Sequence, residues 1–135
     1  MKSLIINFIS FIIIISFFSC TPNENVRSST ESVPEKLSFG NYKITFIEIG
    51  STTCIPCQMM QPIMKEIKDS FPNDVQVVFY DLNNRENLKY AQKYSVRVIP
   101  TQIFIDNKGE IIFKHQGFFP KDEIFEFLKS KGVKK

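Results

Sequence analysis

Residues 52–62 read TTCIPCQMMQP, and in this segment two residues separate Cys54 from Cys57. Two thiols at this spacing can form a reversible disulfide and so carry out redox chemistry. The same spacing can also supply half of a tetrahedral zinc site, bind copper, or form an inert structural disulfide. The rest of the chain has to distinguish between these chemistries.

The remaining ligand-type residues favour the redox interpretation. Structural zinc needs four ligands, usually two such pairs, but the only other cysteine is Cys20 and the single histidine, His115, is distant in sequence. An inert disulfide would gain little, because so short a loop loses little entropy on closure. We therefore expect Cys54 to attack a substrate disulfide and Cys57 to resolve the mixed disulfide, with no metal and no bound cofactor.

The elements that must position this pair follow from the hydrophobic pattern. Strands are predicted over 43–49, 75–82, 101–106 and 110–115, and helices over 54–70, 84–94 and 120–131. Pro62 should kink the first helix, and residues 106–109 form a hairpin turn. A βαβ crossover makes the first two strands parallel, and the hairpin adds an antiparallel pair. The fold class is therefore α/β, with a mixed four-stranded sheet covered by helices on both faces.

The position of Cys54 and two neighbouring residues should tune the reactivity of the pair. Cys54 is expected just before or in the first turn of its helix, where unpaired N–H groups and the helix dipole favour a thiolate. Pro56 restricts the loop between the cysteines and so helps to set the redox potential. Glu48 lies in a strand that should be buried, which is costly for an unpaired carboxylate and suits a proton acceptor for Cys57. The alternative for Glu48 is an exposed strand edge.

The N-terminal segment has the anatomy of a signal peptide. Lys2 precedes an apolar run over residues 4–18, which is shorter than the ~20 residues of a membrane-spanning helix. The end of this run, FFSC, resembles a lipoprotein cleavage site, so residues 1–20 would end at a lipidated Cys20. An uncleaved anchor and simple secretion are the alternatives. All three place the rest of the chain outside the cytoplasm, with residues 21–38 as a flexible tether and 39–135 as the domain.

Composition limits the choice of partners. The chain has 135 residues, a length that suits one domain. Its formal net charge of +3 is too small to indicate nucleic-acid binding.

Three segments together resemble the thioredoxin superfamily: TFIEIGSTTCIPCQMMQPIMKEI, SVRVIPTQIFIDNKGEI and HQGFFPKDEIFEFL. Pro62 matches the family's helix-kinking proline, and Gly117 matches a glycine after the last strand. The resemblance implies a cis peptide bond before Pro100, which would present the Ile99 backbone to a substrate peptide. The substrate groove would then contain Ile99, Pro100, Thr53 and Pro56. A departure is Thr53, which stands where thioredoxin has tryptophan.

The predicted location makes the chain similar to the membrane-tethered TlpA and ResA type of thioredoxin-like protein. This similarity implies a monomeric thiol–disulfide oxidoreductase that acts on protein disulfides, fed by a membrane dithiol carrier of the CcdA/DsbD type. Pro56 before Cys57 resembles reducing thioredoxins, so we expect a reductant. A disulfide-donating oxidant is one alternative, and a non-enzymatic lipoprotein for binding or metal delivery is the other.

Overall fold

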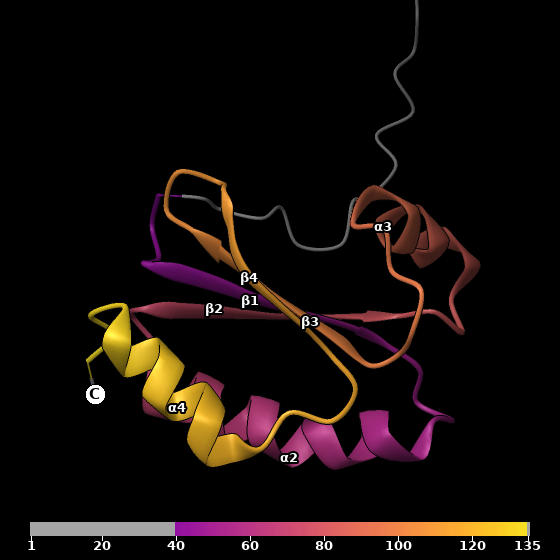
Figure 1. Ribbon diagram of the computed structural model, residues 1–135, viewed down its shortest axis with the longest axis horizontal. Helices are drawn as coiled ribbons and strands as arrows, with labels where there is room; N and C mark the ends of the chain where they lie inside the picture. Colours follow the sequence, from indigo (N-terminus) through magenta and orange to yellow (C-terminus); the bar gives the residue numbers. More distant parts are fainter. Residues whose placement is uncertain (1–39, 135) are drawn as a thin grey trace, which may run out of the picture. The chain divides into compact units, whose positions relative to one another are not determined.

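The computed structural model describes residues 40–134, which form one mixed four-stranded sheet with helices on both of its faces (Figure 1). The strand order is β2-β1-β3-β4. The strands are β1 (Ile44–Gly50), β2 (Val75–Asp81), β3 (Thr101–Asp106) and β4 (Ile111–Gln116), and the helices are α2 (Ile55–Ser70), α3 (Leu88–Lys93) and α4 (Lys121–Ser130). Strand β1 pairs in parallel with β2 and antiparallel with β3, and β3 pairs antiparallel with β4. The predicted fold class is confirmed.

Alternation along β1 divides the core into two layers. Ile44 and Phe46 pack toward α2 and α4 on one face, whereas Ile47 and Ile49 pack toward the α3 face. Figure 1 shows α2 and α4 side by side below the sheet and α3 above it. Because both faces are covered, the whole of β1 is buried, and the loop that leads to Cys54 follows its C-terminal end.

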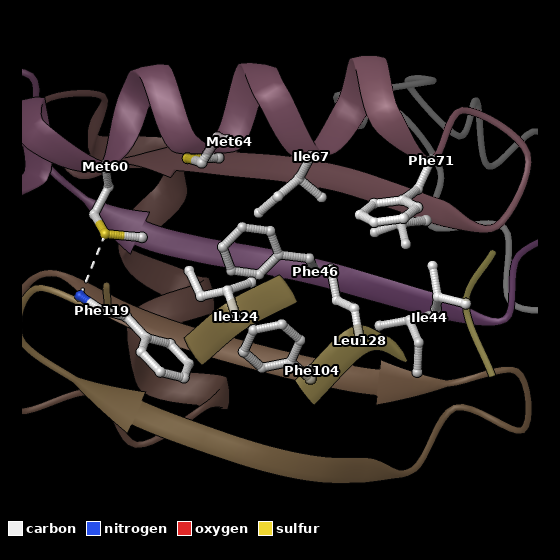
Figure 2. Packing of buried hydrophobic residues seen from close by; sticks show 12 residues of the cluster. Ile44, Phe46, Met60, Met64, Ile67, Phe71, Phe104, Phe119, Ile124 and Leu128 are labelled. Carbon is white, nitrogen blue, oxygen red and sulfur yellow. Dashed lines mark hydrogen bonds between the residues drawn. The ribbon is translucent and has the colours of Figure 1, made fainter. Parts of the chain in front are cut away.

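The core under α2 and α4 is largely aromatic and aliphatic (Figure 2). Phe46 and Phe104 stack with their ring centroids 4.8 Å apart. The sulfur of Met60 accepts a hydrogen bond from the backbone N–H of Phe119 over 3.4 Å. Met60 thereby links α2 to the segment between β4 and α4, which keeps the N-terminal half of α2 in a fixed position on the sheet.

One predicted helix is shorter than expected. The segment 84–94 begins as a 3₁₀ turn over Arg85–Asn87 and becomes α-helical only over Leu88–Lys93. Asn84 accepts a hydrogen bond from the backbone N–H of Glu86, and the Asn87 amide donates to the carbonyl of Asp81. These side chains bind nearby backbone groups and so compete with a regular helix. By contrast, α2 runs through Pro62 as a single helix.

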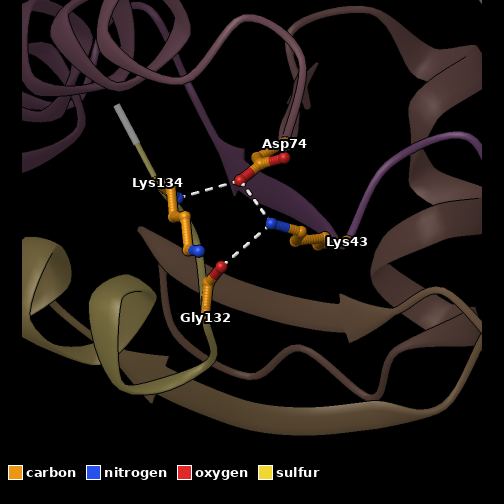
Figure 3. Close-up of polar contacts among 4 residues, drawn as sticks. All are labelled: Lys43, Asp74, Gly132 and Lys134. Carbon is orange, nitrogen blue, oxygen red and sulfur yellow. Dashed lines mark hydrogen bonds and ion pairs between the residues drawn. The ribbon is translucent and has the colours of Figure 1, made fainter.

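The C-terminal segment is fastened at the end of the sheet where β1 begins (Figure 3). The Lys43 ammonium donates to Asp74 at 2.8 Å and to the carbonyl of Gly132 at 3.0 Å, and the N–H of Lys134 donates to Asp74 at 2.8 Å. Lys43 and the Lys134 amide hold the pKa of Asp74 below its ordinary value. The network lies at the opposite end of β1 from the CxxC pair, so its effect is on the fold.

Candidate active site

Cys54 is the N-cap residue of α2, as predicted. Its backbone is extended, with φ −94° and ψ 123°, and its carbonyl accepts the N–H of Gln58 over 2.9 Å. Its own N–H donates to the carbonyl of Ser51 over 3.1 Å. The side chain is half-buried and makes no capping bond. Cys54 therefore stands, partly exposed, at the partially positive end of a helix.

Cys57 lies one turn further along α2 and is fully buried. Its thiol lies within hydrogen-bonding reach of Cys54. Burial is the main cause that raises the pKa of the Cys57 thiol to about 12; the hydrogen bond with Cys54 and the charges of Cys54 and Glu48 raise it further, while a backbone hydrogen bond from Ser51 opposes them. Cys57 therefore needs a base before it can act as a nucleophile at neutral pH.

Gly50, at the end of β1, makes room for the Cys57 sulfur. A Cβ atom at Gly50 would lie 3.0 Å from the Cys57 sulfur and 3.4 Å from the ring of Phe79. The distance to the Phe79 ring is an ordinary contact, but the distance to the sulfur is tighter than a normal contact, so a side chain at Gly50 would require the Cys57 sulfur to shift.

We expect Gly50→Ala to lower the free energy of unfolding by about 1–3 kcal/mol, because the added methyl overpacks the site. Chemical denaturation of the reduced protein measures this effect. The same substitution in a Cys57→Ala background should cost less, because the sulfur is gone. An equal cost in both backgrounds would mean that Gly50 does not accommodate the thiol.

Glu48 is fully buried in the middle of β1, and the exposed-edge alternative is therefore wrong. Neither carboxylate oxygen has a hydrogen-bond partner of ordinary geometry. Burial raises the pKa of Glu48 to about 8, and the Gln102 amide beside it lowers the pKa in part. Glu48 and Gly50 lie on the same face of β1, and Gly50 packs against the Cys57 sulfur, so the charge of Glu48 helps to raise the pKa of the Cys57 thiol. A carboxyl group with this pKa can accept a proton close to neutral pH.

The segment before β3 completes the site. The peptide bond between Ile99 and Pro100 is cis, as the family resemblance implied. Thr101 pairs with Ile49, so by the same register Pro100 follows beside Gly50. Pro100 is buried and Ile99 is half-buried. Over residues 40–134, the backbone of Ile99 makes no hydrogen bond within the chain, which leaves its amide and carbonyl available.

The other predicted site residues lie around Cys54. Thr53 is exposed, and both its hydroxyl and its N–H bind the Ser51 hydroxyl, at 2.8 and 3.2 Å. Pro56 is half-buried in the first turn of α2. Cys20 lies outside the residues that the structure describes, as do the predicted signal peptide and tether.

Sequence reasoning missed a polar network that holds the loop before Cys54. Asp81, at the end of β2, accepts the hydroxyl of Thr52 at 3.0 Å and the N–H of Asn83 at 3.0 Å. Asn83 in turn donates to Thr52 at 2.8 Å, and Gln58 donates to the Thr52 carbonyl at 2.8 Å. The predicted parallel pairing of β1 and β2 could have indicated this network, because residues that follow two neighbouring parallel strands lie at the same edge of a sheet.

Four large exposed apolar side chains belong to the segments around the site, while two others, Leu88 and Ile111, lie on α3 and β4. Ile55 and Met59 lie one turn apart on α2, with 72% and 51% of their surface exposed. Val98 precedes Ile99, and Phe118 follows Gly117, whose N–H donates to the Pro100 carbonyl over 2.8 Å. We call these four residues the apolar rim: Ile55, Met59, Val98 and Phe118. Phe119, in contrast, belongs to the core.

The chain is similar to known proteins in three respects: it matches a family model, its sequence resembles known sequences, and its fold resembles a solved structure. The family model described as Thioredoxin matches residues 20–130. A thioredoxin from Staphylococcus epidermidis is 32% identical over 85 residues, which are 63% of this chain and 79% of that protein. A thioredoxin from Buchnera aphidicola is 34% identical over 82 residues, covering 61% and 73% respectively. A mutant thioredoxin structure from Halobacterium salinarum is similar in fold, with a TM-score of 0.61 at 23% identity over 70% of this chain and 79% of that one.

Proposed function

The chain belongs to the thioredoxin family and is a thioredoxin-like thiol–disulfide oxidoreductase; from this premise we propose that it reduces disulfides in exported proteins while tethered to a membrane outside the cytoplasm. One observation carries the redox part of the proposal: half-buried Cys54 begins α2 next to Cys57, which is buried and within the influence of Glu48. A nucleophile, a resolving thiol and a base are thus present together.

The proposed reaction has two exchange steps. The Cys54 thiolate attacks one sulfur of a substrate disulfide, which forms a mixed disulfide and releases the other substrate sulfur as a thiolate. Glu48 then takes the proton of Cys57, and the Cys57 thiolate attacks the Cys54 sulfur. This releases the second substrate sulfur and leaves a Cys54–Cys57 disulfide. The substrate has gained two electrons, and a partner dithiol must return the protein to its reduced form.

The substrate would lie across Ile99 and the apolar rim. The free amide and carbonyl of Ile99 offer two hydrogen bonds to an extended peptide. Ile55, Met59, Val98 and Phe118 offer apolar contact around the sulfur that reacts. A disulfide in an incompletely folded polypeptide presents both an extended backbone and apolar side chains, and so suits this surface.

A reducing role is supported by the environment of Cys57. Strong oxidants of this kind are strong because their reduced form is stabilised. Here burial and the neighbouring charges outweigh the Ser51 backbone hydrogen bond and disfavour the thiolate of Cys57, so this sulfur does not stabilise the reduced pair as an anion.

The redox potential of the Cys54–Cys57 pair should accordingly lie near thioredoxin's roughly −270 mV. Equilibration of the full chain, in mild detergent, with dithiothreitol or glutathione buffers measures it. A value near roughly −120 mV would instead indicate a disulfide-donating oxidant. A low potential would direct the search to a membrane electron donor of the CcdA/DsbD type.

The tethered TlpA- or ResA-like subtype is proposed from the N-terminal sequence: cleavage before Cys20 leaves Cys20 as the acylated N-terminus, and residues 21–38 join it to the domain over 39–135. Cys20→Ser should abolish incorporation of labelled palmitate and release the protein from the membrane fraction, because the acyl chains hold it there. Cell fractionation with metabolic labelling checks this, and Cys54→Ser serves as a control that retains the label. Equal labelling of Cys20→Ser would contradict the lipoprotein proposal.

A further inference from the structure

A row of three polar side chains crosses the sheet on the face that carries α2. In the antiparallel register, Glu48 on β1 lies directly opposite Gln102 on β3, and Gln102 lies directly opposite His115 on β4. Residues directly opposite each other point to the same face of a sheet. Glu48 and Gln102 are fully buried, whereas His115 is half-buried and stacks on Phe119 at the outer end of the row.

Packing alone does not explain why a polar amide, that of Gln102, occupies this buried position. Neither its oxygen nor its nitrogen has a hydrogen-bond partner of ordinary geometry, and the same is true of both oxygens of Glu48. Burying an unpaired amide costs free energy that leucine would avoid at the same position. The only polar group directly opposite on β1 is the Glu48 carboxyl, and the Gln102 amide is close enough to influence its ionisation.

We propose that Gln102 is a positioning residue for disulfide exchange: its amide N–H donates to the ionised Glu48 carboxylate and holds it toward Cys57. This inference rests on the proposed function. A donor to the charged form of a carboxylate favours that form. In the exchange, the Cys57 thiol gives its proton to the Glu48 carboxylate, so that a thiolate and a carboxylic acid result, and the thiolate then attacks the Cys54 sulfur. Gln102 sets how much carboxylate is ready at neutral pH.

The groups around Glu48 leave the Gln102 amide as the one that can stabilise the Glu48 carboxylate. On β2 its neighbour is the apolar ring of Phe79. From α2, the titratable group that Glu48 influences is Cys57, whose thiol lies next to Cys54. On β4, His115 lies one position further along the row than Gln102. Within residues 40–134, no ion pair involves Glu48, so the Gln102 amide is its nearest source of stabilisation.

The test compares pH profiles of single-turnover reduction of a disulfide-bonded peptide by the reduced full chain. In the wild type, we expect the rate to rise through a limb near pH 8, which Glu48→Gln should remove. Gln102→Leu should move this limb upward by about one pH unit or more, because a hydrogen bond to a charged group is lost. The rate at pH 7 should therefore fall roughly tenfold, while the two profiles converge well above the limb.

Two controls separate this role from a structural one. Gln76→Leu removes another buried glutamine, which pairs with Thr45 on β1, and should leave the limb where it is. In a Glu48→Gln background, Gln102→Leu should have no further effect on the rate. An unmoved limb in Gln102→Leu, or an equal rate loss in both backgrounds, would overturn the inference.

A readout without catalysis distinguishes failure of the inference from failure of the proposed function. In carbon-13-labelled protein, the titration of the Glu48 carboxyl should move upward in Gln102→Leu by the same amount as the limb. If the wild type reduces the peptide but neither the titration nor the limb moves, the inference is wrong and the function stands. If the wild type reduces no peptide at all, the proposed function fails and the inference fails with it, whatever the titration shows.

Discussion

Replacing Cys57 with serine should stop disulfide reduction at the mixed disulfide. Cys54 keeps its accessible place at the start of α2 and can still attack a substrate. The buried partner that would resolve the intermediate is then missing, because a serine hydroxyl cannot take part in disulfide exchange. Turnover should fall at least about a thousandfold, as it does when one member of a catalytic unit is removed. Meanwhile the substrate should remain covalently attached to the protein.

Non-reducing electrophoresis with mass spectrometry checks the trapped intermediate. Cys54→Ser is the matched variant: it should lose turnover to the same degree, but it should trap nothing, because Cys57 is buried and its thiol has a raised pKa. Insulin reduction with dithiothreitol measures turnover for all three proteins. If both variants reduce insulin as fast as the wild type, the enzymatic interpretation is lost. A stoichiometric copper complex of the wild type would then favour metal delivery.

The stability of the fold should fall as the pH rises from about 4.5 to about 8 because of Glu48. Its pKa is about 8 in the folded protein, against an ordinary value of 4.5. Below pH 4.5 both states bind the proton, so the stability is fully present. Between the two values the unfolded state releases the proton while the folded state retains it, and unfolding is increasingly favoured. Above pH 8 the loss is complete.

The expected loss is about 5 kcal/mol, since each unit of difference in pKa corresponds to about 1.4 kcal/mol. This is comparable to the total stability of many domains. Guanidinium denaturation of the reduced protein between pH 4 and pH 9 measures it. Glu48→Gln should flatten the curve and be the more stable protein at pH 9. The three aspartates with lowered pKa values, Asp74, Asp81 and Asp106, titrate below this window.

Glu126→Gln is the matched control for this pH dependence. Glu126 is exposed on α4, so its replacement should reproduce the wild-type curve. A wild-type curve that is flat between pH 4.5 and pH 8 would show that Glu48 ionises normally. In that case Glu48 could not be the base for Cys57 that its burial suggests.

The fold class and the positions of the two cysteines could be predicted from sequence because both depend on local patterns. Apolar runs with strand or helix periodicity define the elements, and the βαβ order fixes which strands are parallel. Pro62 lies inside α2, as the predicted helix over 54–70 implied, and the kink expected there stays a prediction. The segment 84–94 was predicted as one helix, and it was shortened by local hydrogen bonds of Asn84 and Asn87. Periodicity does not report such bonds.

The sequence by itself determined that a CxxC pair begins a helix after a buried strand, since those facts depend on residues close together in the chain. The tertiary structure decided what surrounds the pair. The burial of Glu48, its cross-strand neighbour Gln102 and the Asp81 network depend on which strands are neighbours and in which register. The fit of Cys57 against Gly50 also depends on how the elements pack, because a few tenths of an ångström separate contact from clash there. Register and close packing are properties of the assembled sheet, because they arise between residues distant in sequence.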